Sequence, residues 1–537
     1  MKHNKLFFLM LILSANLTVF SAKVDNPDVF GSVGSMSGGL DIRQQHQTTF
    51  TNPVILGDVA DPTVIKVDGV YYACGTSSEW APYYPMYSST DLINWKQEGH
   101  VFNKKPSWTS NSFWAPELYY HNNKVFCYYT ARNKKNGISG IGVASTDDPT
   151  KEFTDHGLLI EHGKEAIDAY VFNDDGQLYI SWKAYGLESR PIELVASKLS
   201  YDGLRLEGEP FSLLKDDEEI GMEGQSHFKH GDYYYIVYAA RGCCGFNSDY
   251  EVRVARSKSF KGPYEKYEHN PILAGLKHDF ISIGHGTIVE TDDNRMFYMC
   301  HAYLNGEGKY AGRQPVIYEM YVDDNDWMAF KGGQIARKTQ TLPFEGSYQQ
   351  SSQAFEDDFT STTLNVNWTW NYPYSDIQTT IRNGNLYLTG KPVGKKAVNG
   401  NALCVRPQFP DYEYQTQVVN RNKSLKGLTL YGDYENFVAW GVEDNQFVLK
   451  QYDNNKEVVL FSKPIESQYS YVKILVKEGR KLDFYYADKE EEWNKALDSS
   501  IDMEKLVRWD RIARPGLIHI GETKEHAAFS YFKLTKL

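Results

Sequence analysis

Hydrophobic and polar positions along this chain fall into short apolar segments separated by turns rich in Gly, Asn and Asp. Five segments share one pattern, in which an apolar strand is followed by a tight polar turn and a second strand rich in Tyr, Phe and Cys. The turns are Asp68-Gly69, Asn122-Asn123, Asp175-Gly176, His230-Gly231 and Asp293-Asn294. Because Gly and Asn accept the positive φ of a two-residue hairpin, each segment predicts two antiparallel strands.

The five hairpins recur at steps of 54, 53, 55 and 63 residues, counted between their second turn residues. Further short strands are predicted inside each repeat, such as Pro85–Ser88, Gly140–Ala144 and Glu251–Ala255. Three to four strands in each of five units predict a five-bladed β-propeller over residues 51–340. A long β-sandwich with coincidental turns is the alternative, and the even spacing disfavours it.

A second domain is predicted after a polar linker at residues 341–353. Residues 354–537 contain short strands separated by Gly, Asn and Asp turns, without a repeat, which is typical of a β-sandwich. The predicted fold class is therefore all-β, a five-bladed β-propeller followed by a β-sandwich. For the sandwich we favour a structural role at the mouth of the propeller pocket over an independent binding role.

The N-terminal segment has the layout of a secretory signal. Residues 1–22 begin with two lysines, continue with the apolar run Leu6–Leu13 and end in Ser21-Ala22. Residues 23–50 are predicted to form a flexible leader, being rich in Gly and Ser. We therefore expect an exported protein, periplasmic or extracellular, with no membrane partner after signal cleavage.

Composition narrows the class of partner. The 57 Lys and Arg residues stand against 69 Asp and Glu residues, and the formal charge of −12 disfavours nucleic acid or an anionic membrane surface. Aromatic residues make up 14% of the chain, which excludes intrinsic disorder and suits binding to the faces of sugars.

The six cysteines do not have the spacing of a zinc site, because the chain contains no Cys-x-x-Cys motif. Most lie within apolar strand segments, where a small buried residue is expected. Cys243-Cys244 is the exception, since it lies between two glycines. The sequence leaves two states open for this pair, a vicinal disulfide in a loop and two free thiols.

Three acidic residues share one position in the repeat. Eight residues before the second turn residue, the five units carry Asp61, Ala115, Asp168, Glu223 and Gly286. Because the innermost strands of all blades face one central pocket, these acids are expected to meet at the propeller axis. Acids gathered at a buried axis repel one another, an arrangement that favours a catalytic role.

These residues resemble glycoside hydrolase family 43, and the resemblance covers essentially the whole chain after Asn52. Gly57–Thr63 is similar to the segment carrying the general base, Phe113–Glu117 to the second-blade signature, and Glu223-Gly224 to the segment carrying the general acid. The part from Phe355 onward is similar to the concanavalin A-like sandwich that follows the propeller in β-xylosidase-like members.

The resemblance implies an inverting, exo-acting hydrolase that releases L-arabinofuranose or D-xylose from plant-polysaccharide oligosaccharides. Asp61 is then the ionised base and Glu223 the protonated acid, and Asp168 raises the pKa of Glu223 by like-charge repulsion. His285 and Arg313 are implied to bind substrate. Neither a cofactor nor a metal is expected, and a structural calcium ion near His285 is not indicated.

Aromatic candidates for stacking on the sugar are Trp80 and Trp114, which fall in segments expected on the pocket side.

Two other functions remain open at this point. One is a retaining fructosidase of the related five-bladed clan, whose nucleophile motif has Asn before Asp-Pro, where this chain has Ala60. The other is a sugar-binding propeller without catalysis, which the presence of all three acids disfavours.

Overall fold

The computed structural model describes residues 48–185, 192–344, 355–393, 400–506, 509 and 511–537. The predicted signal segment, nearly all of the predicted leader and most of the predicted linker lie outside these described residues. Within the described ranges, no helix combines the length and the apolar character needed to cross a bilayer.

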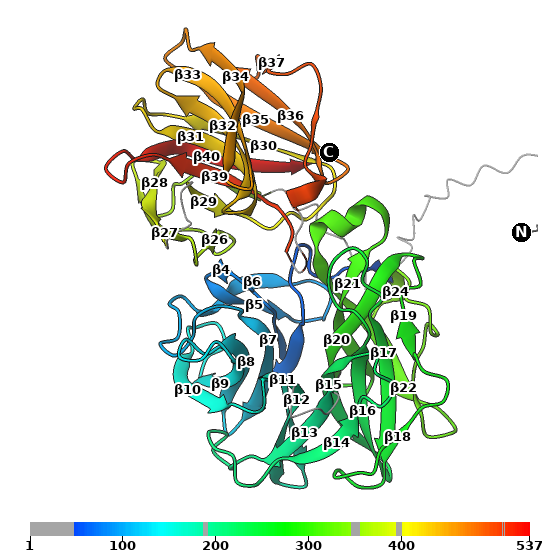
Figure 1. Cartoon of the computed structure of the whole chain (residues 1–537). Helices are drawn as coiled ribbons and strands as arrows, with labels where there is room; N and C mark the ends of the chain where they lie inside the picture. The colour runs from blue at the N-terminus through cyan, green and yellow to red at the C-terminus, as the bar shows by residue number, and fades with distance from the viewer. Residues whose placement is uncertain (1–47, 186–191, 345–354, 394–399, 507–508, 510) are drawn as a thin grey trace, which may run out of the picture. The chain divides into compact units, whose positions relative to one another are not determined.

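Five antiparallel β units follow one another along the first part of the chain (Figure 1). Their strands are, in order, β2 (Thr63–Val67), β3 (Val70–Cys74), β5 (Tyr83–Ser89) and β6 (Lys96–Phe102); β7 (Trp114–His121), β8 (Lys124–Arg132), β9 (Ser139–Thr146) and β10 (Thr154–Ile160); β11 (Glu165–Asp174), β12 (Gln177–Tyr185), β13 (Glu193–Lys198) and β14 (Phe211–Lys215); β15 (Met222–His230), β16 (Tyr233–Ala240), β17 (Glu251–Ser257) and β18 (Glu265–Lys266); β20 (Phe280–Glu290), β21 (Met296–Leu304), β22 (Arg313–Val322) and β23 (Met328–Phe330). The first strands contact one another in a closed cycle, β2 with β7, β7 with β11, β11 with β15, β15 with β20 and β20 with β2. This cycle confirms the predicted five-bladed propeller.

The two ends of the propeller are joined by a short pair of strands. β1 (Thr49–Thr51) pairs antiparallel with β24 (Thr339–Thr341), which follows the fifth blade. Pairing the first strand with the last ties the circle of blades together.

Three of the five predicted hairpin turns lie where the sequence placed them, and two do not. In the fourth blade His230 pairs with Tyr233, so the turn residues are Gly231 and Asp232, one position later than predicted. In the fifth blade Glu290 pairs with Met296, so the connection has five residues instead of two.

In each blade a residue near the start of the inner strand has a positive φ and takes an equivalent place around the axis. These residues are Asp61 (φ 51°), Ala115 (φ 38°), Asp168 (φ 59°), Gly224 (φ 59°) and His285 (φ 52°). In the last four blades the residue lies at a break in the register with the second strand, which is a β-bulge. The bulge bends the strand locally.

The second domain consists of two antiparallel sheets packed over one large apolar core. The first sheet contains β25 (Phe355–Asp357), β27 (Ser375–Arg382), β28 (Asn385–Pro392), β30 (Tyr412–Val418), β35 (Tyr471–Lys477), β36 (Lys481–Ala487), β37 (Asn494–Lys495), β38 (Ile501–Asp502) and β40 (Ala527–Lys536). The second contains β29 (Asn401–Cys404), β31 (Leu425–Asp433), β32 (Asn436–Glu443), β33 (Gln446–Asp453), β34 (Lys456–Pro464) and β39 (Arg514–Ile520). The predicted β-sandwich is therefore confirmed.

Strand pairing connects the sandwich to the first blade. β4 (Trp80–Ala81) pairs antiparallel with β26 (Trp370–Asn371). The side-chain amide of Asn371 also donates to the backbone carbonyl of Glu79 at 3.2 Å. The segment that follows the first blade's β3 is thus fixed by residues of the C-terminal domain.

Candidate active site

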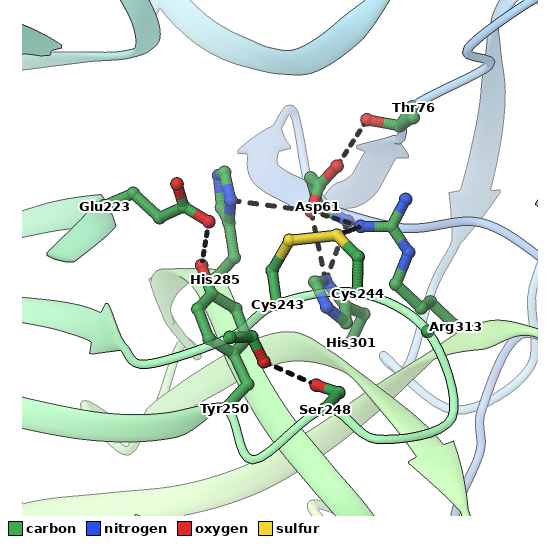
Figure 2. The surroundings of a disulfide bond; sticks show 12 residues. Asp61, Thr76, Glu223, Cys243, Cys244, Ser248, Tyr250, His285, His301 and Arg313 are labelled. Carbon is green, nitrogen blue, oxygen red and sulfur yellow. Dashed lines mark hydrogen bonds and ion pairs between the residues drawn. A yellow bond between two sulfur atoms is a disulfide. The ribbon is translucent and has the colours of Figure 1, made fainter. Parts of the chain in front are cut away.

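A cavity of about 230 Å³ lies where the positive-φ residues of the blades converge. Its lining comprises Asp61, Trp114, Ala115, Arg132, Glu165, Ile167, Asp168, Lys183, Glu223, Cys243, Cys244, His285, Arg313 and Trp509. All five blades contribute to it, and the three acids predicted from the sequence lie in it together. Figure 2 shows Asp61 and Glu223 with the side chains that surround them.

Three polar side chains lie beside the Asp61 carboxyl. Its Oδ2 accepts a hydrogen bond of 2.6 Å from the Thr76 hydroxyl, and its Oδ1 lies 3.4 Å from Arg313 Nη1 and 3.2 Å from His301 Nδ1. Burial alone would raise the pKa of this carboxyl, but Arg313, followed by His285 and His301, holds the pKa well below its usual range. Asp61 is therefore an ionised carboxylate in a buried site.

Glu223 is held by two side chains. Its Oε2 forms an ion pair of 2.6 Å with Lys183 Nζ, and its Oε1 accepts a hydrogen bond of 2.9 Å from the Tyr250 hydroxyl. Asp168 is fixed from the neighbouring bulge, because Gly224 N donates to Asp168 Oδ2 at 3.1 Å. Because Gly224 directly follows Glu223 in the chain, this hydrogen bond ties Asp168 to the backbone beside Glu223.

The charges of Asp168 and Glu223 differ from the sequence expectation. Burial raises the pKa of Asp168 to about 7, and the charge of Glu223 adds to this effect, while His285 opposes it. Burial would also raise the pKa of Glu223, but Lys183 lowers it below its usual range. The predicted protonated state of Glu223 is wrong for the free enzyme, because Lys183 outweighs the effect of burial and lowers the pKa of Glu223. The two carboxyls titrate as a pair that binds one proton near neutral pH.

The predicted binding residues divide between the cavity and the domain interface. His285, Arg313 and Trp114 line the cavity, and His285 Nδ1 lies 3.5 Å from Asp61 and 3.9 Å from Asp168. Trp80 does not line it. Trp80 is 2% exposed and packs between Tyr431 of the sandwich and the Arg514 guanidinium, 4.0 Å from its ring centre. The expected stacking of Trp80 on sugar does not fit this position, because pairing of β4 with the sandwich removes it from the pocket.

Glu117 lies in the second-blade signature, and its buried side chain contacts the inner strands of the first and fifth blades. Thr63 Oγ1 donates to Glu117 Oε2 at 2.8 Å, and Thr287 Oγ1 lies 3.5 Å from the same oxygen. Burial raises the pKa of Glu117 to about 8, so the group is neutral at pH 7. It joins the inner strands of the first, second and fifth blades, and it does not line the cavity.

Sequence reasoning missed Lys183, Thr76, His301 and Tyr250. One of them left a signal, since Lys183 is the single charged residue within the apolar strand β12. His301 lies in the apolar strand β21 of the fifth blade and accepts a hydrogen bond of 3.0 Å from the backbone N of Asp61. Burial lowers the pKa of His301 to about 4, so its ring is neutral.

One cavity residue comes from the C-terminal domain. Trp509 is 61% exposed and lines the cavity, with its ring centre 6.2 Å from that of Trp114. The two rings stand edge to face, at an interplanar angle of 77°. Across the described ranges, no group of three or more His, Cys, Asp and Glu side chains has an arrangement that would hold a metal ion.

Comparison with known proteins agrees with this geometry. The family model for glycosyl hydrolases family 43 matches residues 50–328, and the model for the β-xylosidase C-terminal concanavalin A-like domain matches residues 356–535. A non-reducing-end α-L-arabinofuranosidase from Bacteroides ovatus is 28% identical over 364 residues, which are 65% of this chain and 66% of the relative. A β-xylosidase from Bacillus subtilis is 25% identical over 516 residues, 85% of this chain and 92% of the relative.

Solved structures show the same fold. The crystal structure of a xylan β-1,4-xylosidase from Bacillus halodurans superposes with a TM-score of 0.78 at 22% identity, and the match covers 90% of this chain and all of that one. The match to the family model spans more than half of the sequence and includes all three acids of the cavity. This chain therefore belongs to glycosyl hydrolases family 43 and is a glycoside hydrolase.

Proposed function

We propose that this enzyme removes single pentose units from the non-reducing ends of oligosaccharides, with inversion at the anomeric carbon. One observation carries the proposal. An ionised carboxylate, Asp61, shares a small cavity with Asp168 and Glu223, a pair that binds one proton near neutral pH. A general base and a general acid are the two groups that an inverting glycosidase requires.

Each carboxyl has a role that its surroundings support. Asp61 takes a proton from the attacking water, and Arg313 keeps it charged while it waits for substrate. Glu223 delivers the proton of the Asp168–Glu223 pair to the glycosidic oxygen. Asp168 holds that proton nearby in the free enzyme, because Lys183 stabilises the ionised form of Glu223.

The dimensions of the cavity favour a single terminal sugar. Its volume of about 230 Å³ lies below the range of about 300 to 1,000 Å³ common for drug-sized ligands. A cavity of this size favours one pentose unit over a segment of polysaccharide. Trp114 and Trp509 supply aromatic surface at this site, and the charged groups supply partners for hydroxyls.

The relatives support two sugars. The Bacteroides ovatus relative is named for α-L-arabinofuranose and the Bacillus subtilis relative for β-xylose. We therefore expect L-arabinofuranose or D-xylose to be released from fragments of plant polysaccharides. The match to family 43 leaves no support for the fructosidase alternative, and the intact set of three acids argues against a binding propeller without catalysis.

Product stereochemistry tests the proposal. The enzyme is mixed with nitrophenyl α-L-arabinofuranoside or nitrophenyl β-D-xylopyranoside, and proton NMR is recorded in the first minutes, before the sugar mutarotates. The first-formed pentose should have the anomeric configuration opposite to that of the substrate. Initial retention would show that Asp61 attacks carbon instead of activating water, and absence of release from both substrates would refute pentosidase activity.

We also propose that the protein is exported. The lysines, the apolar run and the small residues of the first 22 positions support this, and so does the disulfide between Cys243 and Cys244, since disulfides persist in oxidising compartments. N-terminal sequencing of protein recovered outside the cytoplasm should begin near residue 22 or 23. A recovered chain that retains Met1 would contradict export by this signal.

A further inference from the structure

The lining of the cavity contains one group to which the reaction above gives no task. Cys243 and Cys244, adjacent in sequence, form a disulfide, and both line the cavity with Asp61, Glu223 and Arg313. Figure 2 shows the two sulfurs among these side chains. In the described part of the chain the other four cysteines are free and buried, whereas this pair is half-buried.

Stabilisation of the fold does not explain this bond. A disulfide stabilises a protein chiefly by closing a loop of the unfolded chain, and the effect grows with the length of that loop. Cys243 and Cys244 are separated by one position, so the bond closes no chain segment. Loop closure therefore gives the bond no stabilising role, and its position in the cavity points to a role in the contacts made there.

The sulfurs lie beside the groups proposed to bind and activate water. Arg313 Nη1 lies 3.6 Å from Cys244 Sγ and 3.4 Å from Asp61 Oδ1, so one guanidinium nitrogen touches both. Eight of the twelve other residues that line the cavity have charged or polar side chains: Asp61, Arg132, Glu165, Asp168, Lys183, Glu223, His285 and Arg313. The disulfide carries no N–H or O–H donor, so it presents an apolar surface at this point of the cavity.

The segment that carries the disulfide is held from both sides. We call residues 241–250, between β16 and β17, the disulfide loop. Within it Ser248 Oγ donates to the carbonyl of Gly242 at 2.6 Å, and Gly242 N donates to Asp249 Oδ1 at 2.9 Å. From outside, the Tyr303 hydroxyl accepts a hydrogen bond of 3.3 Å from Gly245 N. The disulfide loop ends at Tyr250, which binds Glu223.

We propose that the Cys243–Cys244 disulfide is a substrate-contacting wall of the terminal-sugar subsite, an inference that rests on the proposed pentosidase function. A pentose presents hydroxyls at its edges and C–H groups on its faces. Arg313, Asp61 and the other charged side chains bind hydroxyls, and the two sulfurs pack against the C–H surface beside them. The bond holds both sulfurs at one place, so the wall is formed before substrate arrives.

The test compares the wild type with Cys243→Ser/Cys244→Ser, which keeps the side-chain size but loses the bond and the apolar surface. We expect KM for the nitrophenyl pentosides to rise about five- to tenfold, with kcat within about threefold of the wild type, because uniform binding is lost. Isothermal titration calorimetry with free L-arabinose and D-xylose should show the same weakening of Kd, independently of turnover.

Reduction of the wild type gives a second measurement that does not depend on folding of the variant. A phosphine reductant breaks the S–S bond, the two sulfurs take up protons as thiols, and the phosphine takes up oxygen from water as its oxide. Two thiols should become reactive in the native protein while the four buried ones stay unreactive. KM should rise in the reduced wild type, and the same treatment should leave the double variant unchanged.

The results separate this inference from the proposed function. If pentose is released but KM and Kd stay within twofold in both the double variant and the reduced wild type, the wall is refuted. A fall in kcat with unchanged KM and Kd also refutes it, since that pattern would indicate a role in holding Tyr250 and Glu223. If no pentoside is hydrolysed but pentose binding still weakens in the variant, the wall stands and only the proposed reaction fails.

Discussion

Replacing Lys183 by Met should move the pH dependence of the reaction. The Lys183–Glu223 pair spans 2.6 Å, and its side chains are only 12% and 18% exposed. Two unit charges 4 Å apart interact by about 4 kcal/mol at an effective dielectric constant of 20, and the cost of removing the charges from water offsets part of this. Even a net effect of about 1.4 kcal/mol would change the proton affinity tenfold.

The direction follows from which form Lys183 stabilises. In the wild type the activity should fall as the pH rises above about 7, where the Asp168–Glu223 pair loses its proton. Without the cation, Glu223 binds a proton more readily, because its ionised form is no longer compensated. In Lys183→Met the basic limb of the kcat/KM profile should therefore lie about one to two pH units higher.

The assay measures kcat/KM from pH 5 to pH 10 with a nitrophenyl pentoside and with an unactivated disaccharide. The shift should be clearest with the disaccharide, since its leaving group needs protonation. Lys183→Arg serves as the matched control, because it retains the positive charge and should keep the basic limb near that of the wild type. A basic limb of Lys183→Met that stays in place, or moves to lower pH, would refute this account of how the proton is held.

Three further predictions concern other residues of the inner strands. Glu117→Gln should be more stable than the wild type at pH 8 by a few kcal/mol, because the raised pKa of Glu117 (about 8) makes wild-type stability fall between about pH 4.5 and pH 8. Thermal unfolding of both proteins at pH 5 and pH 8 measures this. An equal change in stability between the two pH values in both proteins would contradict it. Gly224→Ala should lose about 2 to 4 kcal/mol of unfolding free energy and most activity, because its φ is +59° and a Cβ would lie 2.5 Å from His285 Cγ. Gly221→Ala is the control: at φ +86°, with no atom closer than 3.5 Å, it should pay only the cost of the backbone conformation and keep its activity. Chemical denaturation of both variants measures the difference, and equal losses of unfolding free energy would contradict the role of the His285 contact. Glu223→Gln should lose about 10²- to 10⁴-fold in kcat on the disaccharide and less on nitrophenyl pentosides, and equal losses on both substrates would argue against an acid role.

Much of the propeller could be predicted because its local signals are strong. Turn residues such as Asp68-Gly69 and Asp175-Gly176 follow from backbone preferences alone, and the blades repeat them. Glu223 was found by a less secure route. Counting back from the true fourth turn reaches Gly224, not Glu223, and the predicted turn was misplaced by one residue. The acid lies in the cavity because it precedes the bulge directly.

The rest of the site depends on contacts that no local pattern encodes. Lys183 meets Glu223 only after the third and fourth blades have packed together, so the sequence could not reveal that it reverses the expected pKa order. Trp80 resembled a pocket residue from its position in the first blade. Its pairing partner, Asn371, lies 291 positions later in the chain, and it decides that Trp80 belongs to the domain interface.

The repeated bulge also bears on how this pocket can change during evolution. Of the five equivalent positions around the axis, three carry Asp61, Asp168 and His285, and Gly224 must stay small because the His285 ring fills the adjacent space. The remaining one, Ala115, already has the required backbone conformation and lines the cavity with only a methyl group. Among larger side chains, Asn, Asp and His tolerate a positive φ best, and one of them at position 115 would extend into this cavity. A single codon in the second blade is thus the simplest route by which descendants of this enzyme could acquire a new sugar preference while keeping its acids in place.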